Sequence, residues 1–375
     1  MELGTFRKQP EGYTAFIPES FPPSSGFQFS QEILRKSDTA VRLLGKLDGI
    51  TQLLPDVDFF LFMYIRKDAA SSSQIEGTHA TMIDAIEAEA RIETDIPSDV
   101  DDILHYIKAL NYGMRRMQEF PFVLRFVREL HKELMEGARS THHAYPGEFR
   151  RTQNWIGGTS WNNASFVPPP VEDMNRALGD LEKFVHSEGD LLPLIKAGIL
   201  HAQFETIHPF TDGNGRTGRM LITFFLWKAG LLERPVLFLS SYFKRHQKVY
   251  YERLRGYHHG EAERWMDFFL DGVIDIAQEA IDIVSKITTI RDRDMMKLQK
   301  LSTRASESAA VVLPKLFQLP IVTTRHVQEW TGFTYPGAQK LIDRFVDMKI
   351  LTPRKQASKY AQSYIYKDYV DIFSN

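Results

Sequence analysis

The sequence predicts a mainly α-helical protein with one small β-hairpin and a C-terminal α+β module. Apolar residues recur at helical spacing from about residue 31 to about residue 290, as in Leu194, Ile195 and Ile199. Glycine and asparagine pairs interrupt the apolar residues between 153 and 167, a pattern typical of a hairpin. Beyond residue 303 the pattern indicates helix, helix, turn, helix and a short terminal hairpin.

The length of 375 residues suits two or three domains. We expect an irregular N-terminal arm followed by helices over 1–110, a helical catalytic domain over 111–300, and the α+β module over 301–375. This last segment carries ten basic and six acidic residues, whereas the whole chain has a net charge of −2. A modestly basic module is compatible with nucleic acid, but chance asymmetry explains it equally well.

Composition excludes several kinds of protein. The chain has no cysteine, so disulfides, thiolate zinc sites and a cysteine nucleophile are ruled out. The first residues lack the apolar core of a secretory signal, and no apolar run approaches the roughly 18 residues that span a bilayer. We therefore expect a cytoplasmic protein with no membrane partner.

The strongest local signal is the run His208-Pro-Phe-Thr-Asp-Gly-Asn-Gly-Arg-Thr-Gly-Arg219. Helical patterning ends before it, Pro209 breaks the helix, and the pattern resumes near Arg216. A glycine-rich turn that opens a helix presents several backbone N–H groups at the positive end of the helix dipole. The run therefore predicts an anion-binding loop.

The side chains of this loop suit a polyphosphate. Arg216 and Arg219 lie three residues apart on one side of the first helical turn, where guanidinium groups can grip phosphate oxygens. Asp212 offers a hard oxygen ligand for Mg²⁺, and His208 can serve as a base near neutral pH. The run lacks the Gly-Lys-Ser/Thr ending of a Walker loop and differs from a Rossmann fingerprint.

The run resembles the motif His-Pro-Phe-x-Asp/Glu-Gly-Asn-Gly-Arg-x-x-Arg of Fic proteins, and the resemblance extends over roughly residues 60–290. Fic proteins are helical enzymes that usually transfer AMP from Mg·ATP to Ser, Thr or Tyr hydroxyls, although some relatives transfer other phosphate-linked groups. The resemblance implies His208 as general base and Asp212 as the Mg²⁺ ligand. It also implies that the phosphates are held by Gly213, Asn214, Gly215, Arg216 and Arg219.

Two further segments resemble parts of a Fic active site. The stretch 147–158 is similar to the flap hairpin, which aligns a target segment by strand addition in the family. The stretch 242–254 is similar to the segment that contacts adenine, although neighbouring aromatics at helical spacing are equally typical of a core. The residues implied are Ile156, Gly157, Gly158 and Thr159 in the flap and Tyr250 and Tyr251 at the adenine.

A carboxylate beside a glycine ends a predicted helix at Ser72-Ser-Gln-Ile-Glu76-Gly77. A negative charge at a helix C-terminus opposes the helix dipole, so a cation should compensate it. Ser/Thr-x-x-x-Glu-Gly/Asn is similar to the inhibitory helix of Fic relatives, in which the glutamate pairs with the last motif arginine, Arg219 in this chain. In some relatives the same glutamate helps water to remove AMP from a target.

The C-terminal module resembles a winged helix, with Leu351 and Tyr364 to Tyr366 around the basic stretch Arg354-Lys355. Such folds also serve packing or dimer contacts, so DNA is an open but not favoured partner. Candidate DNA contacts are Tyr335, Gln339, Lys340 and Arg344.

Three functions compete. The first is an autoinhibited protein adenylyltransferase, with ATP and a hydroxyl-bearing protein as partners and a homodimer implied by the family. The second is a de-adenylylase that uses Glu76. The third is a DNA-binding regulator with a nucleotide-sensing Fic domain, which would not require the imidazole of His208.

Overall fold

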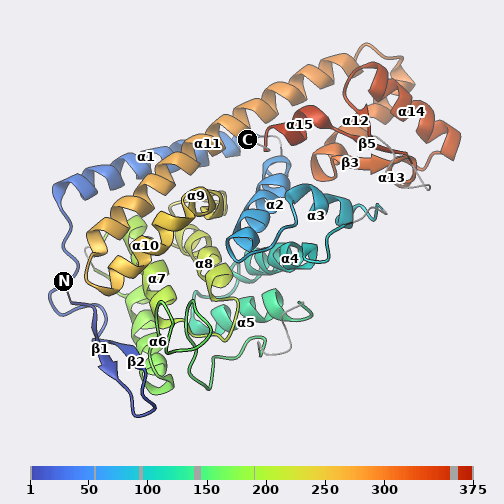
Figure 1. Cartoon of the computed structure of the whole chain (residues 1–375). Helices are drawn as coiled ribbons and strands as arrows, with labels where there is room; N and C mark the ends of the chain where they lie inside the picture. The colour runs from blue at the N-terminus through green and yellow to red at the C-terminus, as the bar shows by residue number, and fades with distance from the viewer. Residues whose placement is uncertain are drawn as a thin grey trace. The chain divides into compact units, whose positions relative to one another are not determined.

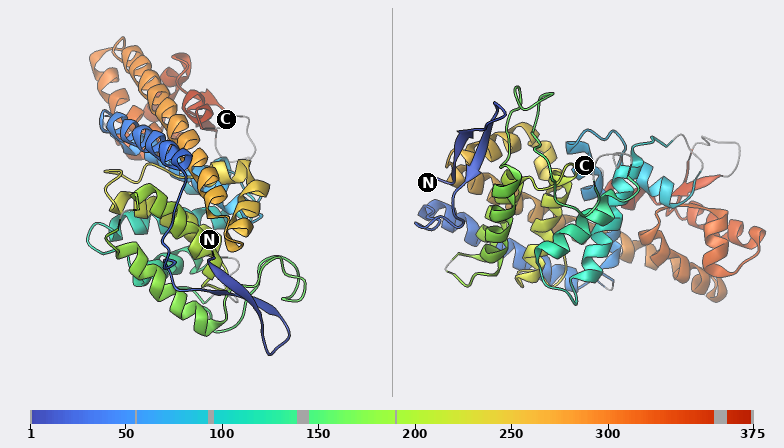
Figure 2. Two further views of the ribbon diagram at one scale, coloured as in Figure 1. Left: turned by 90° about the vertical axis from the view of Figure 1, so that its left-hand side faces the viewer. Right: turned by 90° about the horizontal axis from the view of Figure 1, so that it is seen from below.

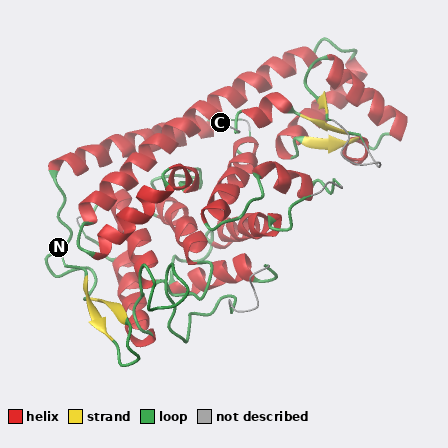
Figure 3. Ribbon diagram, viewed as in Figure 1, coloured by secondary structure: helices red, strands yellow, loops and turns green. Residues whose placement is uncertain are grey.

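Helices dominate the structure, a computed structural model that describes residues 2–54, 56–92, 96–138, 145–189, 191–354 and 362–373 (Figure 3). The chain divides into two compact units. The first contains residues 1–48, 71–77 and 104–278, and the second contains 49–70, 78–103 and 279–375. The predicted mainly α fold is confirmed, while the predicted domain limits after residues 110 and 300 stay predictions.

The helices up to residue 298 follow one another along the chain, and the segment that connects α5 to α6 contains the predicted flap (Figure 1). They are α1 (Gln31–Gln52), α2 (Asp58–Ile75), α3 (Met82–Glu89), α4 (Val100–Arg116), α5 (Leu124–Met135), α6 (Val171–His186), α7 (Pro193–Ile207), α8 (Asn214–Lys228), α9 (Ser240–Arg245), α10 (Gln247–His258) and α11 (Ala262–Leu298).

Helix α7 is the buried centre of the first unit. All its residues from Leu194 to Ile207 are buried, which is the pattern of a helix that packs on every side. Close neighbours require a glycine at Gly198, where a Cβ would lie 2.8 Å from the Phe269 ring. Trp265 donates its indole N–H to the Gly198 carbonyl at 2.8 Å. This packing fixes the helix that ends just before His208.

The N-terminal residues form a β-hairpin, which corrects the expected irregular arm (Figure 2). Strand β1 (Gly4–Lys8) pairs antiparallel with β2 (Thr14–Pro18), with Phe6 opposite Phe16. The Phe16 N–H donates to the Val167 carbonyl at 3.0 Å, so β2 also contacts the predicted flap. Buried apolar residues of β2 stabilise this arrangement, which the short Pro- and Ser-rich sequence did not reveal.

The predicted flap is less regular than the expected hairpin. A single bridge joins Ile156 to Phe166, with the Ile156 N–H donating to the Phe166 carbonyl at 2.8 Å. Gly157 and Gly158 adopt positive φ angles, and the Asn163 side chain accepts from the Thr159 N–H at 2.9 Å. The left-handed turn and this side-chain bond replace further ladder bonds.

The second unit contains the predicted C-terminal α+β module. Its elements are α12 (Thr303–Gln318), β3 (Ile321–Thr323), α13 (Thr324–Thr331), α14 (Tyr335–Asp347), β4 (Thr352–Pro353), β5 (Ser363–Ile365) and α15 (Lys367–Asp371). The strands form one antiparallel sheet in the order β3-β5-β4. Lys355 of the predicted basic stretch lies outside the described residues, and the identification as a winged helix stays a prediction.

One candidate DNA contact is engaged inside this module. Gln339 accepts from the Thr324 hydroxyl at 2.7 Å and donates to Asp343 at 2.8 Å and Tyr364 at 3.0 Å. Reading a base would require breaking these bonds. In the part of the chain that the structure describes, no helix combines the length and apolar character that crossing a membrane requires.

Candidate active site

The loop from His208 to Gly213 joins two buried helices and carries two left-handed residues. His208 follows the last residue of α7 with φ 49° and ψ 60°, and Gly213 precedes α8 with φ 76°. A left-handed conformation is natural for glycine but uncommon for histidine, so the surroundings must hold His208 in place. The loop between two helices that the sequence predicted is therefore present, and its first residue has a strained backbone conformation.

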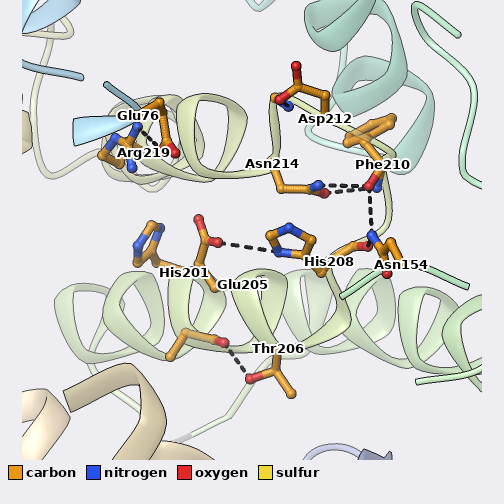
Figure 4. Close-up of polar contacts among 12 residues, drawn as sticks. Glu76, Asn154, His201, Glu205, Thr206, His208, Phe210, Asp212, Asn214 and Arg219 are labelled. Atoms are coloured by element: carbon orange, nitrogen blue, oxygen red, sulfur yellow. Dashed lines mark hydrogen bonds and ion pairs between the residues drawn. The ribbon is translucent and has the colours of Figure 1, made fainter. Parts of the chain in front are cut away.

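Side chains lock the middle of the loop. Asn214 accepts from the Phe210 N–H and donates to the Phe210 carbonyl, both at 2.8 Å (Figure 4). The His131 ring stacks on Phe210 at 3.6 Å and lies 3.0 Å from the Asp212 carbonyl. Asn214 was predicted to hold phosphate. Its side chain is hydrogen-bonded to Phe210, so only its backbone N–H is available to bind an anion.

Two residues that the sequence interpretation missed hold the His208 backbone. Arg150 donates to the His208 carbonyl at 3.0 Å, and Asn154 donates to the same oxygen at 3.2 Å. Arg150 is only 3% exposed and also donates to the carbonyls of Thr152 and Pro169. Burial lowers the pKa of Arg150 to about 10, which still leaves it charged at neutral pH.

The imidazole of His208 reaches a cavity while its surroundings are largely protein. Its side chain is 19% exposed, and its Nδ1 lies 3.8 Å from a carboxyl oxygen of Glu205. Burial, together with the positive charge of Arg150, lowers the pKa of His208 to about 4. The imidazole is therefore neutral at physiological pH, the form in which it can accept a proton.

The start of α8 has the geometry that the sequence predicted for an anion site. Its first N–H groups have no intrahelical acceptor by geometry, and they include those of Asn214, Gly215 and Arg216. A Cβ on Gly215 would lie 2.3 Å from a carboxyl oxygen of Glu76, so only glycine permits an acidic group this close. Asp212, half exposed and 3.7 Å from Arg216, provides one carboxylate at the same end.

One carboxylate suits a Mg²⁺ ion that takes most of its remaining ligands from water and nucleotide phosphates. Among the described residues, no cluster of three or more histidine, aspartate or glutamate side chains would hold a metal by itself. Asp212 therefore fits a metal that arrives with a nucleotide.

The last arginine of the loop is paired with the predicted inhibitory segment. Arg219 donates to the Glu76 carboxylate at 2.8 Å, to the Ser72 hydroxyl at 2.9 Å and to the Ser72 carbonyl at 3.0 Å. The Arg219 side chain is 2% exposed and that of Glu76 is 39% exposed. Gly77 follows with φ 98°, as expected for the glycine after a helix. The predicted cation for Glu76 is thus present, 143 residues away in sequence.

A cavity of about 480 Å³ connects these groups. His208, Glu76, Arg219 and Gly215 line it, as do Ile156 and Gly157 of the predicted flap; Gly158 and Thr159 do not. The two residues predicted to contact adenine, Tyr250 and Tyr251, also line the cavity. Tyr250 is 1% exposed, and its hydroxyl lies 2.8 Å from His201 Nε2, whereas Tyr251 is 41% exposed. The predicted base His208, Gly215 at the start of α8 and the carboxylate of Glu76 therefore line one cavity.

Two stretches of the chain match models of one protein family. Residues 121–226 match the model of the Fic/DOC family, and residues 34–115 match the model of the Fic/DOC family N-terminal region. The chain therefore carries the Fic/DOC domain together with the N-terminal region of that family.

Relatives and solved structures agree with this assignment. The chain is 26% identical over 245 residues to the protein adenylyltransferase Fic of Drosophila erecta, covering 63% of this chain and 45% of the relative. It is 33% identical over 127 residues to the protein of the same name from Culex quinquefasciatus, covering 33% and 23%. The chain thus spans less than half the length of these relatives.

A Fic family protein from Desulfovibrio desulfuricans shares the fold, with a TM-score of 0.57 at 18% identity, over 90% of this chain and 97% of that one. A Fic domain containing signaling protein from Bacteroides thetaiotaomicron has a TM-score of 0.55 at 20% identity, over 66% and 97%.

Proposed function

We propose that this protein is an autoinhibited protein adenylyltransferase that transfers AMP from Mg·ATP to a Ser, Thr or Tyr hydroxyl of a protein. The single observation that carries the proposal is the cavity in which His208, the start of α8 and the Arg219–Glu76 pair meet. The relatives named protein adenylyltransferase Fic supply the class of reaction.

In the proposed reaction, the neutral imidazole of His208 takes the proton of the target hydroxyl. The hydroxyl oxygen forms a bond to the α-phosphorus of ATP, the bond from that phosphorus to the bridging oxygen breaks, and pyrophosphate leaves. The N–H groups at the start of α8 and the guanidinium of Arg216 hold the phosphates. Asp212 would hold Mg²⁺, which neutralises phosphate charge when bound.

Glu76 inhibits transfer in this proposal because its carboxylate binds the guanidinium of Arg219, which would otherwise bind the γ-phosphate. Arg219 is buried, so its guanidinium cannot move to bind both groups. ATP bound beside Glu76 would place its α-phosphate away from the line of attack, and such an error in geometry suppresses the rate.

Glu76→Gly is expected to raise AMP incorporation about ten- to a hundredfold, because coupling between two sites is typically about 1–3 kcal/mol. The measurement incubates wild type, Glu76→Gly and Glu76→Gly/His208→Ala with Mg²⁺ and ATP labelled at the α-phosphate, with and without cell lysate. Protein-bound label is then counted.

Gln74→Gly is the matched control, since it places a glycine in the last turn of α2, just before Glu76, and leaves Glu76 in place. It should label like wild type. If Glu76→Gly labels neither itself nor the lysate proteins, AMP transfer is no longer the favoured activity. Transfer from other nucleotides and removal of AMP would then be tested.

Ile156→Asp is expected to impair modification of a protein target more than ATP binding. Ile156 is half-buried at the cavity, and its backbone already forms the single bridge of the flap. A charge there would disturb a docked target strand while leaving the phosphate loop intact. The measurement compares transfer to lysate proteins with ATP affinity by calorimetry, and equal losses in both would contradict the flap assignment.

The remaining assignments of this proposal concern the setting of the protein. A cytoplasmic location and a homodimer follow from the sequence interpretation and the family, and size measurement in solution tests the second. AMP removal stays the alternative activity, while DNA binding is not favoured because Gln339 is bonded within its own module. A gel-shift assay at low ionic strength tests DNA binding.

A further inference from the structure

Two buried polar groups face each other beside the proposed base. The Nδ1 atom of His208 and the Oε1 atom of Glu205 are both shielded from solvent, and neither has a hydrogen-bond partner among the described residues. Glu205 lies in the last turn of α7, His208 follows the end of that helix, and the two side chains point toward each other (Figure 4). Their closest atoms, Nδ1 and Oε2, are 3.8 Å apart. A movement of about 1 Å would form a hydrogen bond.

The position of Glu205 is set by close packing against α8. A Cβ on Gly218 would lie 2.6 Å from Glu205 Oε1, so the carboxyl group occupies space that only a glycine leaves open. The Glu205 side chain is 9% exposed and lines the cavity that His208 also lines. The carboxyl group is therefore buried beside the reaction site and directed toward the imidazole rather than toward solvent.

We propose that Glu205 is the positioning residue of the base, and that its ionised carboxylate accepts the Nδ1–H of His208. This inference rests on the proposed function, because it assigns Glu205 to the base of that same reaction. The arrangement would fix the tautomer in which Nε2 carries the free electron pair. Nε2 takes the proton of the target hydroxyl, Nδ1 keeps its own proton, and the carboxylate stabilises the resulting imidazolium.

The need for such a partner follows from the burial of His208. Because burial lowers its pKa to about 4, the isolated imidazole is a weak base at neutral pH. A carboxylate at Nδ1 favours the protonated ring and so raises its basicity. The backbone carbonyl of Glu205 also faces the ring and is the rival acceptor, which variants of the side chain leave unchanged.

The protonation state of Glu205 makes the inference testable by pH. Burial raises the pKa of Glu205 to about 8, with Arg219 lowering it and Glu76 raising it. Below that pH the carboxyl group carries a proton and would donate to Nδ1, which imposes the wrong tautomer. Activity should therefore rise as pH increases through the pKa of Glu205. The charged or titratable groups that face Glu205 are Glu76, His201, His208, Arg219, Tyr250 and Tyr251.

The test uses the Glu76→Gly protein, in which removal of one acidic neighbour should move the rise to pH 8 or below. Self-labelling with α-labelled ATP is measured from about pH 6 to about pH 9.5 for Glu76→Gly alone and with Glu205→Gln or Glu205→Leu. Both variants are expected to lose the rise with pH and about 100-fold of the rate at the upper plateau, with the KM for ATP changed less than about threefold.

A variant that keeps both the plateau rate and the rise with pH would overturn the inference and leave the backbone carbonyl as the acceptor. Failure of Glu76→Gly itself to label would count against the proposed function instead. In that case the inference is tested by measuring the ¹⁵N NMR shifts of the His208 ring at about pH 9. The Nδ1–H form is expected with Glu205, and the same form in Glu205→Gln and Glu205→Leu would overturn the inference.

Discussion

Replacing His208 by alanine in the Glu76→Gly protein is expected to lower the rate of AMP transfer about 1,000-fold and to leave ATP affinity within a few fold. General base catalysis typically contributes between about 10² and 10⁴ in rate. The phosphates are expected to contact the start of α8 and the arginines rather than the imidazole. A residue that acts only on the attacking hydroxyl should therefore change kcat and spare binding.

Single-turnover labelling and calorimetric titration with ATP measure these two quantities. Thr211→Ala in the same background is the control, because Thr211 is an exposed residue of the same loop. It should retain the rate of Glu76→Gly. Transfer by His208→Ala at more than about a tenth of the parent rate would assign the base to another group.

The loop could be predicted from sequence because its chemistry is contiguous. The break at Pro209, the glycines that permit a left-handed turn and the two arginines lie within twelve residues, so local rules and the family motif describe them together. The structure places the loop between α7 and α8, as the pattern indicated. The Glu76–Arg219 contact spans 143 residues and was accessible only through the family resemblance, since Ser-x-x-x-Glu-Gly by itself has three free positions.

The support of the loop could not be predicted because it depends on contacts between distant segments. Arg150, Asn154 and His131 lie 58, 54 and 81 residues from the backbone atoms that they bind, and none belongs to a recognisable pattern. From the sequence, Glu205 and His201 lie one helical turn apart before the motif and were expected to support the loop rather than to react, and only the structure shows that Glu205 is buried against Gly218 and His208. The N-terminal hairpin was missed because its strands are five residues each and stabilised by tertiary packing.

Arg150→Met is expected to lower the free energy of unfolding by about 3 kcal/mol and to reduce AMP transfer about 100-fold. The guanidinium is buried and bonds three carbonyl oxygens, and an unsatisfied buried acceptor costs about 1–3 kcal/mol. Asn154 still satisfies the His208 carbonyl, so the main losses are at Thr152 and Pro169. Part of the cost is offset because the buried charge itself is removed, as the lowered pKa of Arg150 indicates.

The effect on transfer follows from the strained conformation of His208. With one of two donors to its carbonyl removed, the residue can relax from its left-handed φ of 49°, which would turn the imidazole away from the target hydroxyl. Arg151→Met is the matched control, because that side chain is 84% exposed and pairs only with Glu148 among the described residues. Urea unfolding and labelling in the Glu76→Gly background measure both effects. If Arg150→Met and Arg151→Met unfold at the same urea concentration and transfer at the same rate, the loop does not depend on Arg150, and the left-handed His208 is held by Asn154 and the packing of Phe210 alone.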